Sequence, residues 1–146
     1  MTTHQTLLFA TVAAIVVAVD QSTKAAAQTG SVVRNPAYAL GVGHGSAFLL
    51  AFGTIAVLGM FIGVLGRWTV RIGVSPAVPA LLAGGMLANT LDRVRLGAVR
   101  DFIHTPWLVV NVADIAVAVG IITTAVYLAR VATRLPHAGL RGPARG

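Results

Sequence analysis

Four apolar stretches alternate with polar connections along the chain. They cover about residues 6–27, 47–66, 72–92 and 107–129, the first continuing past Asp20. A helix crosses the hydrocarbon core of a bilayer with about 20 mostly apolar residues, at about 1.5 Å per residue. The pattern therefore predicts an all-α, polytopic membrane protein with four transmembrane helices.

Prolines and small residues mark positions inside these stretches. Pro76 and Pro79 stand in the first turns of the third stretch, where a missing N–H group costs little. Gly84, Gly85 and Ala88 follow, and they predict a face that a neighbouring helix can approach closely. GMFIG (59–63), in the second stretch, has a small-xxx-small spacing that favours packing within the chain over dimerisation.

The first stretch also has the length of a cleaved signal peptide. No basic segment precedes it, and Asp20 and Lys24 occupy the place of a small, neutral cleavage region. We therefore expect a membrane helix that is retained in the mature protein.

The connections between the stretches differ in composition. About 20 residues rich in Gly and turn formers separate the first two helices, and a short basic loop (67–71) separates the next two. A mixed loop covers 92–106. We expect one membrane domain over residues 1–130 and a basic, flexible cytoplasmic tail over 131–146.

The composition supports a lipid environment. Of 146 residues, 56% are hydrophobic and 10% are charged, whereas about 25% are charged in a typical soluble domain. The formal net charge of +7 fits basic ends and loops that face anionic lipid headgroups, so we expect no nucleic-acid partner. The absence of cysteine excludes disulfides and thiolate chemistry.

An even number of helices places both termini on one side of the membrane. In the predicted topology that side carries six arginines, and the opposite side carries four arginines and Lys24. The difference is small, but the basic tail and the tight basic loop favour cytoplasmic termini.

Acidic residues are few and fall on one side of the predicted topology. There is no Glu, and the four aspartates are Asp20, Asp92, Asp101 and Asp114. All four lie at the face opposite the termini, whichever side that is. Asp20 and Asp101 are equally compatible with simple ion pairs at the water boundary. Asp114 has no Lys or Arg within ten residues, so it needs a partner from another helix.

Asp92 is the candidate partner of Asp114. Each follows an asparagine by three residues, Asn89 in NTLD and Asn111 in NVAD, so an amide lies one helical turn from each carboxylate. Two adjacent carboxyl groups do not both ionise easily, and a pair that shares one proton can activate water and protonate a leaving amine. The pattern predicts an aspartic dyad of Asp92 and Asp114.

Other hydrolytic chemistries find no support in the sequence. The four histidines, at positions 4, 44, 104 and 137, show no H-E-x-x-H spacing, and there is no G-x-S-x-G motif. We expect neither a metal ion nor a cofactor.

The same residues carry a likeness to a known family. Four motif blocks follow one another: DQSTK (20–24), RNPAYALG (34–41), GGMLANTLDRVRLGAVRDFI (84–103) and NVADIA (111–116). They resemble signal peptidase II, the bacterial prolipoprotein signal peptidase family, whose third block reads G-G-x-x-x-N-x-x-D-R…G-x-V-x-D-F. The likeness covers nearly the whole chain except the tail, and the third and fourth blocks are its most specific part.

The resemblance implies a four-helix intramembrane aspartic endopeptidase of the bacterial cytoplasmic membrane, active without metal near the extracytoplasmic face. Such enzymes cut prolipoproteins before a diacylglyceryl-modified cysteine, so lipid-modified prolipoproteins and membrane lipids are the implied partners of an expected monomer. The resemblance assigns catalysis to Asp92 and Asp114. It assigns substrate-binding or supporting roles to Asp20, Lys24, Asn35, Asn89, Arg93, Asp101 and Asn111.

Two departures from the family pattern concern the substrate platform. Ala37, Tyr38 and Leu40 stand where the family has Gly, Ala and an aromatic residue. Only ten residues separate Lys24 from Asn35, where the family usually has a longer segment folded as a small β-cradle, so the resemblance implies a reduced cradle.

Two alternative functions follow. A specialised or inactive paralogue would bind lipoproteins without cleaving them, which the altered platform allows. A small proton-coupled transporter is disfavoured, because all the acids gather at one face and no polar path leads to the other.

Overall fold

The computed structural model describes residues 1–27, 29–39, 42–44, 59 and 73–134. Its elements in chain order are α1 (Thr3–Ala26), the 3-10 helix η1 (Thr29–Ser31), β1 (Val33–Asn35), β2 (Ala37–Ala39), β3 (Val42–His44), α4 (Ala77–Leu96), β4 (Val99–Asp101), β5 (Ile103–His104), β6 (Val109–Val110) and α5 (Val112–Arg134). Apart from Gly59, the predicted second helix lies outside these residues, as do the rest of GMFIG, the loop 67–71 and residues 135–146 of the predicted tail.

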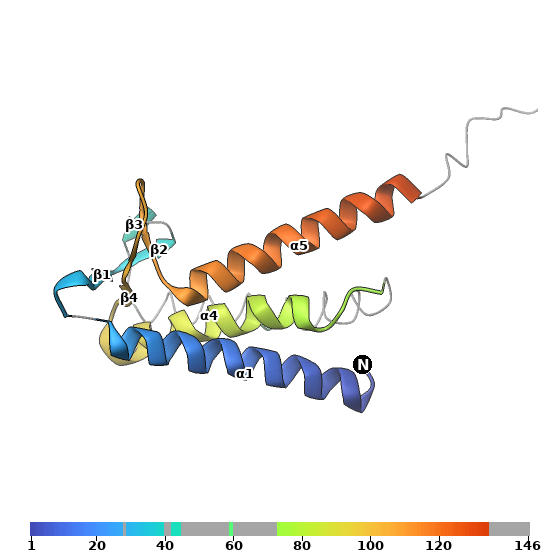
Figure 1. Cartoon of the computed structure of the whole chain (residues 1–146), viewed down its shortest axis with the longest axis horizontal. Helices are drawn as coiled ribbons and strands as arrows, with labels where there is room; N and C mark the ends of the chain where they lie inside the picture. Colours follow the sequence, from blue (N-terminus) through green and yellow to red (C-terminus); the bar gives the residue numbers. More distant parts are fainter. Residues whose placement is uncertain (28, 40–41, 45–58, 60–72, 135–146) are drawn as a thin grey trace, which may run out of the picture.

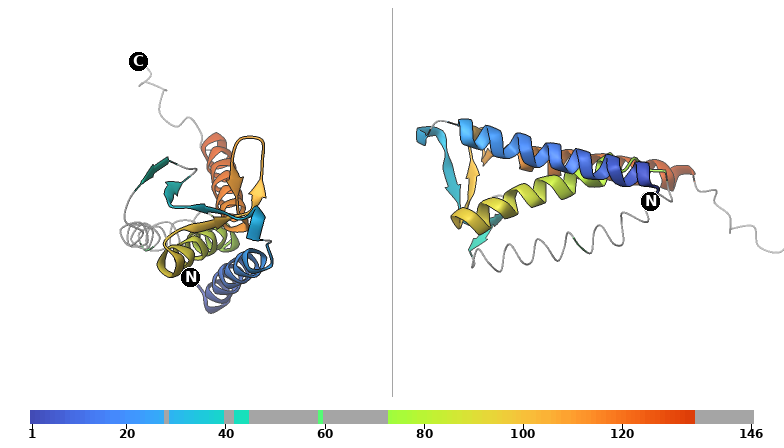
Figure 2. Two further views of the ribbon diagram at one scale, coloured as in Figure 1. Left: turned by 90° about the vertical axis from the view of Figure 1, so that its left-hand side faces the viewer. Right: turned by 90° about the horizontal axis from the view of Figure 1, so that it is seen from below.

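In the described part of the chain, the long helices α1, α4 and α5 run beside one another, and the strands gather at one end of them (Figure 1). α4 packs against both α1 and α5, while α1 and α5 touch each other less (Figure 2). The N-terminus and the C-terminal end of α5 lie at the end of the bundle away from the strands. The strands therefore mark the end at which α1 finishes and α5 begins.

Local capping sets the boundaries of α1 and α4. The Thr2 hydroxyl accepts a hydrogen bond from the Gln5 N–H, and the Gln5 side chain accepts one from the Thr2 N–H, which is a capping box. α4 begins only after Pro76, five residues later than the predicted start at 72. It ends at Leu96, and the next residue, Gly97, has a φ of 74°, the left-handed conformation that glycine adopts readily.

The prediction that residues 107–111 begin the last helix was wrong. Val109–Val110 form β6, which pairs with β5 in a short antiparallel hairpin. α5 starts at Val112, after Asn111, whose side chain accepts from the Asp114 N–H. A short apolar run does not distinguish a strand from a helical turn, and here the capping asparagine sets the boundary. At its other end α5 continues to Arg134, into the predicted tail.

Three two-stranded antiparallel sheets lie at the end of the bundle. β1 pairs with β4, β2 with β3, and β5 with β6. In the first sheet Val33 lies opposite Asp101, Arg34 opposite Arg100, and Asn35 opposite Val99. This sheet joins the connection after α1 to the connection after α4, so two distant parts of the chain meet there.

Two adjacent glycines allow α4 to contact both neighbouring helices. A Cβ atom added at Gly84 would lie 2.8 Å from the Ala13 carbonyl oxygen of α1, and one at Gly85 would lie 2.5 Å from the Ala113 carbonyl oxygen of α5. Ala88, one turn later, is fully buried. The predicted close packing at these three residues is confirmed.

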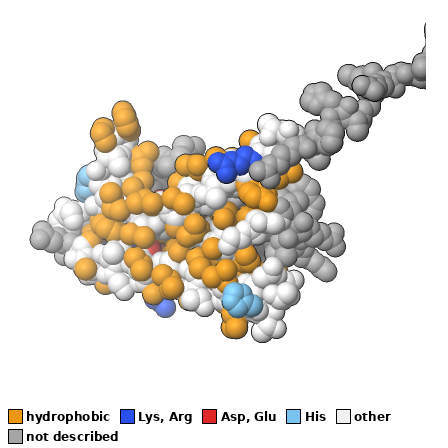
Figure 3. Space-filling model, turned by 45° about the vertical axis from the view of Figure 1, so that its right-hand side comes forward, with side chains coloured by type: hydrophobic (Ala, Val, Ile, Leu, Met, Phe, Trp, Pro, Cys, Tyr) orange, Lys and Arg blue, Asp and Glu red, His pale blue; other side chains and the backbone are white. Residues whose placement is uncertain are grey.

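Two of the described helices are long and apolar enough to cross a membrane, Thr3–Ala26 and Val112–Thr133. Large aliphatic side chains such as Ile15, Ile121 and Ile122 are exposed on their outer faces. Hydrophobic side chains cover much of the face drawn in Figure 3. An exposed apolar surface of this kind suits contact with lipid rather than water.

Replacing Gly85 with Leu is expected to force α4 and α5 apart. Overpacking typically costs about 1–3 kcal/mol of the unfolding free energy, and here the obstacle is backbone, which yields less easily than a side chain. Gly30→Leu is the matched control, because a Cβ at Gly30 meets no atom within 4 Å. Thermal unfolding in detergent measures both variants, and equal midpoints would contradict the close helix contact.

Candidate active site

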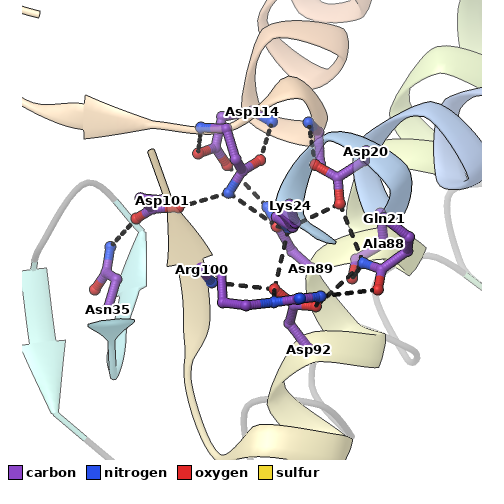
Figure 4. A network of polar contacts seen from close by, with 12 residues as sticks. Asp20, Gln21, Lys24, Asn35, Ala88, Asn89, Asp92, Arg100, Asp101 and Asp114 are labelled. Atoms are coloured by element: carbon purple, nitrogen blue, oxygen red, sulfur yellow. Dashed lines mark hydrogen bonds and ion pairs between the residues drawn. The ribbon is translucent and has the colours of Figure 1, made fainter. Parts of the chain in front are cut away.

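All four aspartates lie at the end of the bundle that carries the strands (Figure 4). Asp20 is on α1, Asp92 on α4, Asp101 on β4, and Asp114 in the first turn of α5. Asp20, Asp92 and Asp101 are at most 2% exposed. The predicted convergence of the acids at one end is confirmed.

Lys24 is the centre of the polar network. Its ammonium nitrogen lies 2.8 Å from Asp20 Oδ2 and 3.2 Å from Asp92 Oδ2, and it donates to Asn89 Oδ1 at 3.0 Å. Because an ammonium group has three N–H donors, each donor has one acceptor here. The side chain is fully buried, so the two carboxylates are what make this cation tolerable away from water.

Asp92 is enclosed by hydrogen-bond donors. Arg100 supplies three: its backbone N–H at 3.0 Å and Nε at 3.3 Å donate to Oδ2, and its terminal amino group donates to Oδ1 at 2.8 Å. Gln21 Nε2 donates to Oδ1 at 3.1 Å. These hydrogen bonds and the negative charge of Asp92 raise the pKa of Arg100 above its ordinary value. Asp92 thus forms ion pairs with two cations, Lys24 and Arg100.

Asp20 connects α1 to the start of α5. Its Oδ1 accepts from the Ala113 N–H at 2.9 Å, while its Oδ2 faces Lys24. A carboxylate at a helix N-terminus is stabilised by the N–H groups that have no partner within the helix.

Asn111 and Asp114 form a reciprocal cap on α5. Asn111 Oδ1 accepts from the Asp114 N–H at 2.9 Å, and Asp114 Oδ2 accepts from the Asn111 N–H at 3.2 Å. This is the geometry of a capping box, with Asn and Asp in place of the usual Ser and Glu. Asp114 Oδ1 accepts from Asn89 Nδ2 at 2.8 Å, so both of its oxygens are held.

Asp101 is linked to Asp114 through Asn111. The side-chain Nδ2 of Asn111 donates to Asp101 Oδ1 at 2.6 Å, and its backbone N–H donates to Asp114. Asn35 Nδ2 donates to the other Asp101 oxygen at 3.0 Å. Burial raises the pKa of Asp101 above its ordinary value and the charge of Asp114 adds to this, while the two amide hydrogen bonds act in the opposite direction. Asp101 therefore keeps a proton to higher pH than a free aspartic acid.

Arg93 is buried beside three of the aspartates. Its guanidinium interacts electrostatically with Asp114, Asp101 and Asp92. With Lys24 and Arg100 it supplies three positive charges to a cluster that holds all four side-chain carboxyl groups of the chain. A single proton on one carboxyl group would make this cluster neutral.

The hydrogen bonds of the two asparagines differ from those that the spacing along each helix indicated. Asn89 reaches across to Asp114 on α5 rather than to Asp92 on its own helix, and Asn111 holds both Asp101 and Asp114. Asp92 faces the two cations Lys24 and Arg100, whereas Asn111 joins Asp101 to Asp114. The catalytic role of Asp92 stays a prediction, and these contacts favour Asp101 as the alternative partner of Asp114.

The other residues predicted for the site take part in or adjoin this network. Asp20, Lys24, Asn35, Asn89 and Asn111 make direct hydrogen bonds within it, and Arg93 acts on it through its charge. Two participants were missed. Gln21 follows Asp20 in DQSTK and was a recognisable candidate, whereas the role of Arg100 depends on a strand pairing that no motif indicated.

In the described part of the chain, His, Cys, Asp and Glu side chains form no group of three that could hold a metal ion. The expectation of chemistry without metal or cofactor stays a prediction.

A family model described as "Signal peptidase (SPase) II" matches residues 12–130, which include every residue of the network. The chain belongs to the signal peptidase II family. This is a family of aspartic peptidases, and the family predicted from the motif blocks is confirmed.

Lipoprotein signal peptidases are among the relatives of this family member. One from Methylorubrum extorquens (strain PA1) is 35% identical over 107 residues, which cover 68% of this chain and 60% of that protein. One from Bifidobacterium longum (strain DJO10A) is 34% identical over 134 residues, which cover 77% of this chain and 72% of that protein. The first alignment thus spans less than two thirds of the relative.

A solved structure shares the fold. It is described as a bacterial membrane enzyme determined by the in meso method at 2.3 Å resolution, and it matches with a TM-score of 0.68 at 21% identity. The match covers 91% of this chain and 94% of that one. The fold is therefore that of a mostly helical membrane enzyme with small β-sheets.

Replacing Lys24 with Met would leave Asp20 and Asp92 buried without their shared cation. Loss of one partner from a buried ion pair typically costs about 3–5 kcal/mol of the unfolding free energy. We expect Lys24→Met to unfold at a much lower temperature than the unmodified protein. Arg95→Gln is the control, because Arg95 is an exposed cation on the last turn of α4. The same midpoint for both variants would mean that the buried ammonium is dispensable.

Proposed function

We propose that the chain is an intramembrane aspartic endopeptidase that removes signal peptides from diacylglyceryl-modified prolipoproteins, cutting on the N-terminal side of the lipidated cysteine. Family membership supports the activity, and the names of the relatives support the substrate class. The proposed enzyme has four transmembrane helices in the bacterial cytoplasmic membrane, with both termini in the cytoplasm. Its active site lies near the extracytoplasmic face. The proposed enzyme is a monomer surrounded by membrane lipids.

Asp101 and Asp114 are the catalytic pair in this proposal. The observation that carries it is the double contact of Asn111, 2.6 Å to Asp101 and 3.2 Å to Asp114. Because burial raises the pKa of Asp101, this carboxyl group is the one expected to carry the shared proton. Asp114 is only half-buried, and it is then the base.

Peptide hydrolysis requires one base and one acid. Asp114 takes a proton from a water molecule, whose oxygen attacks the scissile carbonyl carbon, and Asp101 gives its proton to the carbonyl oxygen. As the tetrahedral intermediate collapses, Asp114 returns its proton to the leaving amine, and Asp101 regains one from a hydroxyl group of the intermediate. The leaving amine becomes the α-amino group of the lipidated cysteine.

The other residues of the network hold the two carboxyl groups in place and set the charge around them. Asn35, Asn89 and Asn111 fix the carboxyl oxygens through the hydrogen bonds described above. The positive charge of Arg93, which acts on both members of the pair, is suited to offset negative charge that builds up in the transition state. Asp92 has a structural role in this proposal, as the counter-ion of Lys24 and Arg100.

Three isosteric variants distinguish the two candidate pairs. Asp101→Asn and Asp114→Asn are each expected to lower kcat by about 100- to 10,000-fold, the usual contribution of general acid–base catalysis. Asp92→Asn keeps one oxygen that can accept a hydrogen bond from Arg100. It is therefore expected to lower the thermal midpoint and to lower kcat, per folded molecule, by no more than about tenfold, a change of about 1.4 kcal/mol in the barrier. Cleavage of a synthetic diacylglyceryl-modified prolipoprotein by the purified protein measures all three.

Two results would contradict this assignment. An active Asp101→Asn variant beside a folded but inactive Asp92→Asn variant would restore the pairing predicted from the sequence. Unmodified protein that binds the precursor and never cuts it would favour the non-enzymatic paralogue.

A further inference from the structure

Arg100 joins the two acidic parts of the site. It directly precedes Asp101 in β4, and its side chain holds Asp92 on α4. The family's third block, G-x-V-x-D-F, leaves this position open. The role of Arg100 in this chain therefore depends on the contacts that it makes.

Successive side chains of β4 point to opposite faces. Val99 and Asp101 are both buried, whereas Arg100 between them is half-buried, which is the alternation of a strand. Asp101 thus faces Asn111 while Arg100 faces Asp92. A slip of β4 by one residue would exchange the two faces and turn Asp101 away from Asn111.

Arg100 binds Asp92 through both its backbone and its side chain. Its N–H, Nε and terminal amino group all donate to Asp92, and the terminal amino group also donates to Gln21 Oε1 on α1 at 3.1 Å. Paired guanidinium–carboxylate hydrogen bonds fix geometry more strictly than a point charge does. One residue therefore ties β4 to two helices.

One pair of residues in the sheet of β1 and β4 opposes this register. Arg34 lies directly opposite Arg100, and like charges at directly opposed positions destabilise a strand pair. The contact with Asp92 offsets the charge of Arg100 and so compensates for this repulsion. The register of β4 thus depends on Asp92 as well as on the sheet.

We propose that Arg100 is a positioning residue, whose grip on Asp92 fixes the register of β4 and thereby holds Asp101 beside Asn111 and Asp114. The kinetic consequence rests on the proposed function. The structural consequence does not, because register can be measured in a protein with no activity.

Cross-linking tests the register directly. The chain contains no cysteine, so Asn35→Cys combined with Val99→Cys provides one thiol pair at directly opposed positions, which lie within the Cα separation that a disulfide spans. The amide of Asn35 is then missing from every variant compared, so the difference between them reports on Arg100 alone. With Arg100 present the disulfide is expected to form readily. Adding Arg100→Gln is expected to lower the yield several-fold, and Arg95→Gln, the exposed control, is expected to leave it unchanged. Equal yields with Arg100 and with Arg100→Gln would overturn the proposal.

Kinetics test the effect on the catalytic pair. Arg100→Gln is expected to lower kcat by about 10- to 100-fold, as for a misplacement of about 1 Å, with a smaller change in KM. Arg100→Lys keeps the charge without the paired hydrogen bonds, so it is expected to recover only part of the rate.

The pH profile separates positioning from loss of folded protein. Activity requires the proton on Asp101, so it is lost as the pH rises through the raised pKa of that group. If Asp101 moves out of its buried place beside Asp114, its pKa falls towards the ordinary value, and the alkaline limb of the kcat profile moves to lower pH. A smaller amount of folded enzyme would lower the whole profile without moving the limb, and an unmoved limb in Arg100→Gln would contradict the inference.

Failure of this inference can be told apart from failure of the proposed function. Normal cross-linking and an unmoved limb in Arg100→Gln, with Asp101→Asn and Asp114→Asn inactive, would overturn only the role of Arg100. Full activity of the two aspartate variants would overturn the proposed function, and the cross-linking result would still decide the register.

Discussion

A buried ammonium group holds the acidic end of this molecule together. Lys24 is out of contact with water, and each of its three donors has an acceptor, on Asp20, Asp92 and Asn89. The contacts with Asp92 and Asn89 bind α1 to α4, while Asp20 carries the connection on to α5 through Ala113. Lys24 and Asn111 both donate to the oxygen of Asn89, whose amide nitrogen donates to Asp114. The contacts of Asp114 thus depend in part on a cation that does not touch it.

Close helix packing is the second condition for this arrangement. The side chains of Asp and Asn are short, so hydrogen bonds between them on different helices need helices that pack closely together. Gly84 and Gly85 supply this by lying against the backbones of α1 and α5. The apolar part of the bundle therefore sets the distances that the polar end uses, and a side chain at either glycine would disturb a network about one to two helical turns away.

The gathering of the four aspartates at one end was predictable from the sequence, but the hydrogen-bond partners of each were not. Aspartates are so rare in this apolar chain that helix parity alone placed all four at one end, and the glycine pair was recognisable as a packing face. The partners of each aspartate depend on which side chains reach across the bundle, as Asn89 does to Asp114, and spacing along one helix does not reveal this. The role of Arg100 depends on the pairing of β4 with β1, which lies more than sixty residues earlier in the chain. The strand β6, which pairs with β5, lies in an apolar stretch whose pattern predicted a helix. Local patterns fix neither of these pairings.

We propose that the three cations and the four side-chain carboxyl groups of the cluster balance through one proton on Asp101 or Asp114. Infrared spectroscopy tests it directly, because a protonated carboxyl group absorbs separately from a carboxylate. At a pH that supports cleavage of the precursor, we expect one protonated carboxyl group in the unmodified protein and none in Asp101→Asn, in which three carboxylates match three cations. Four ionised carboxylates in the unmodified protein, or a protonated group that persists in Asp101→Asn, would contradict it.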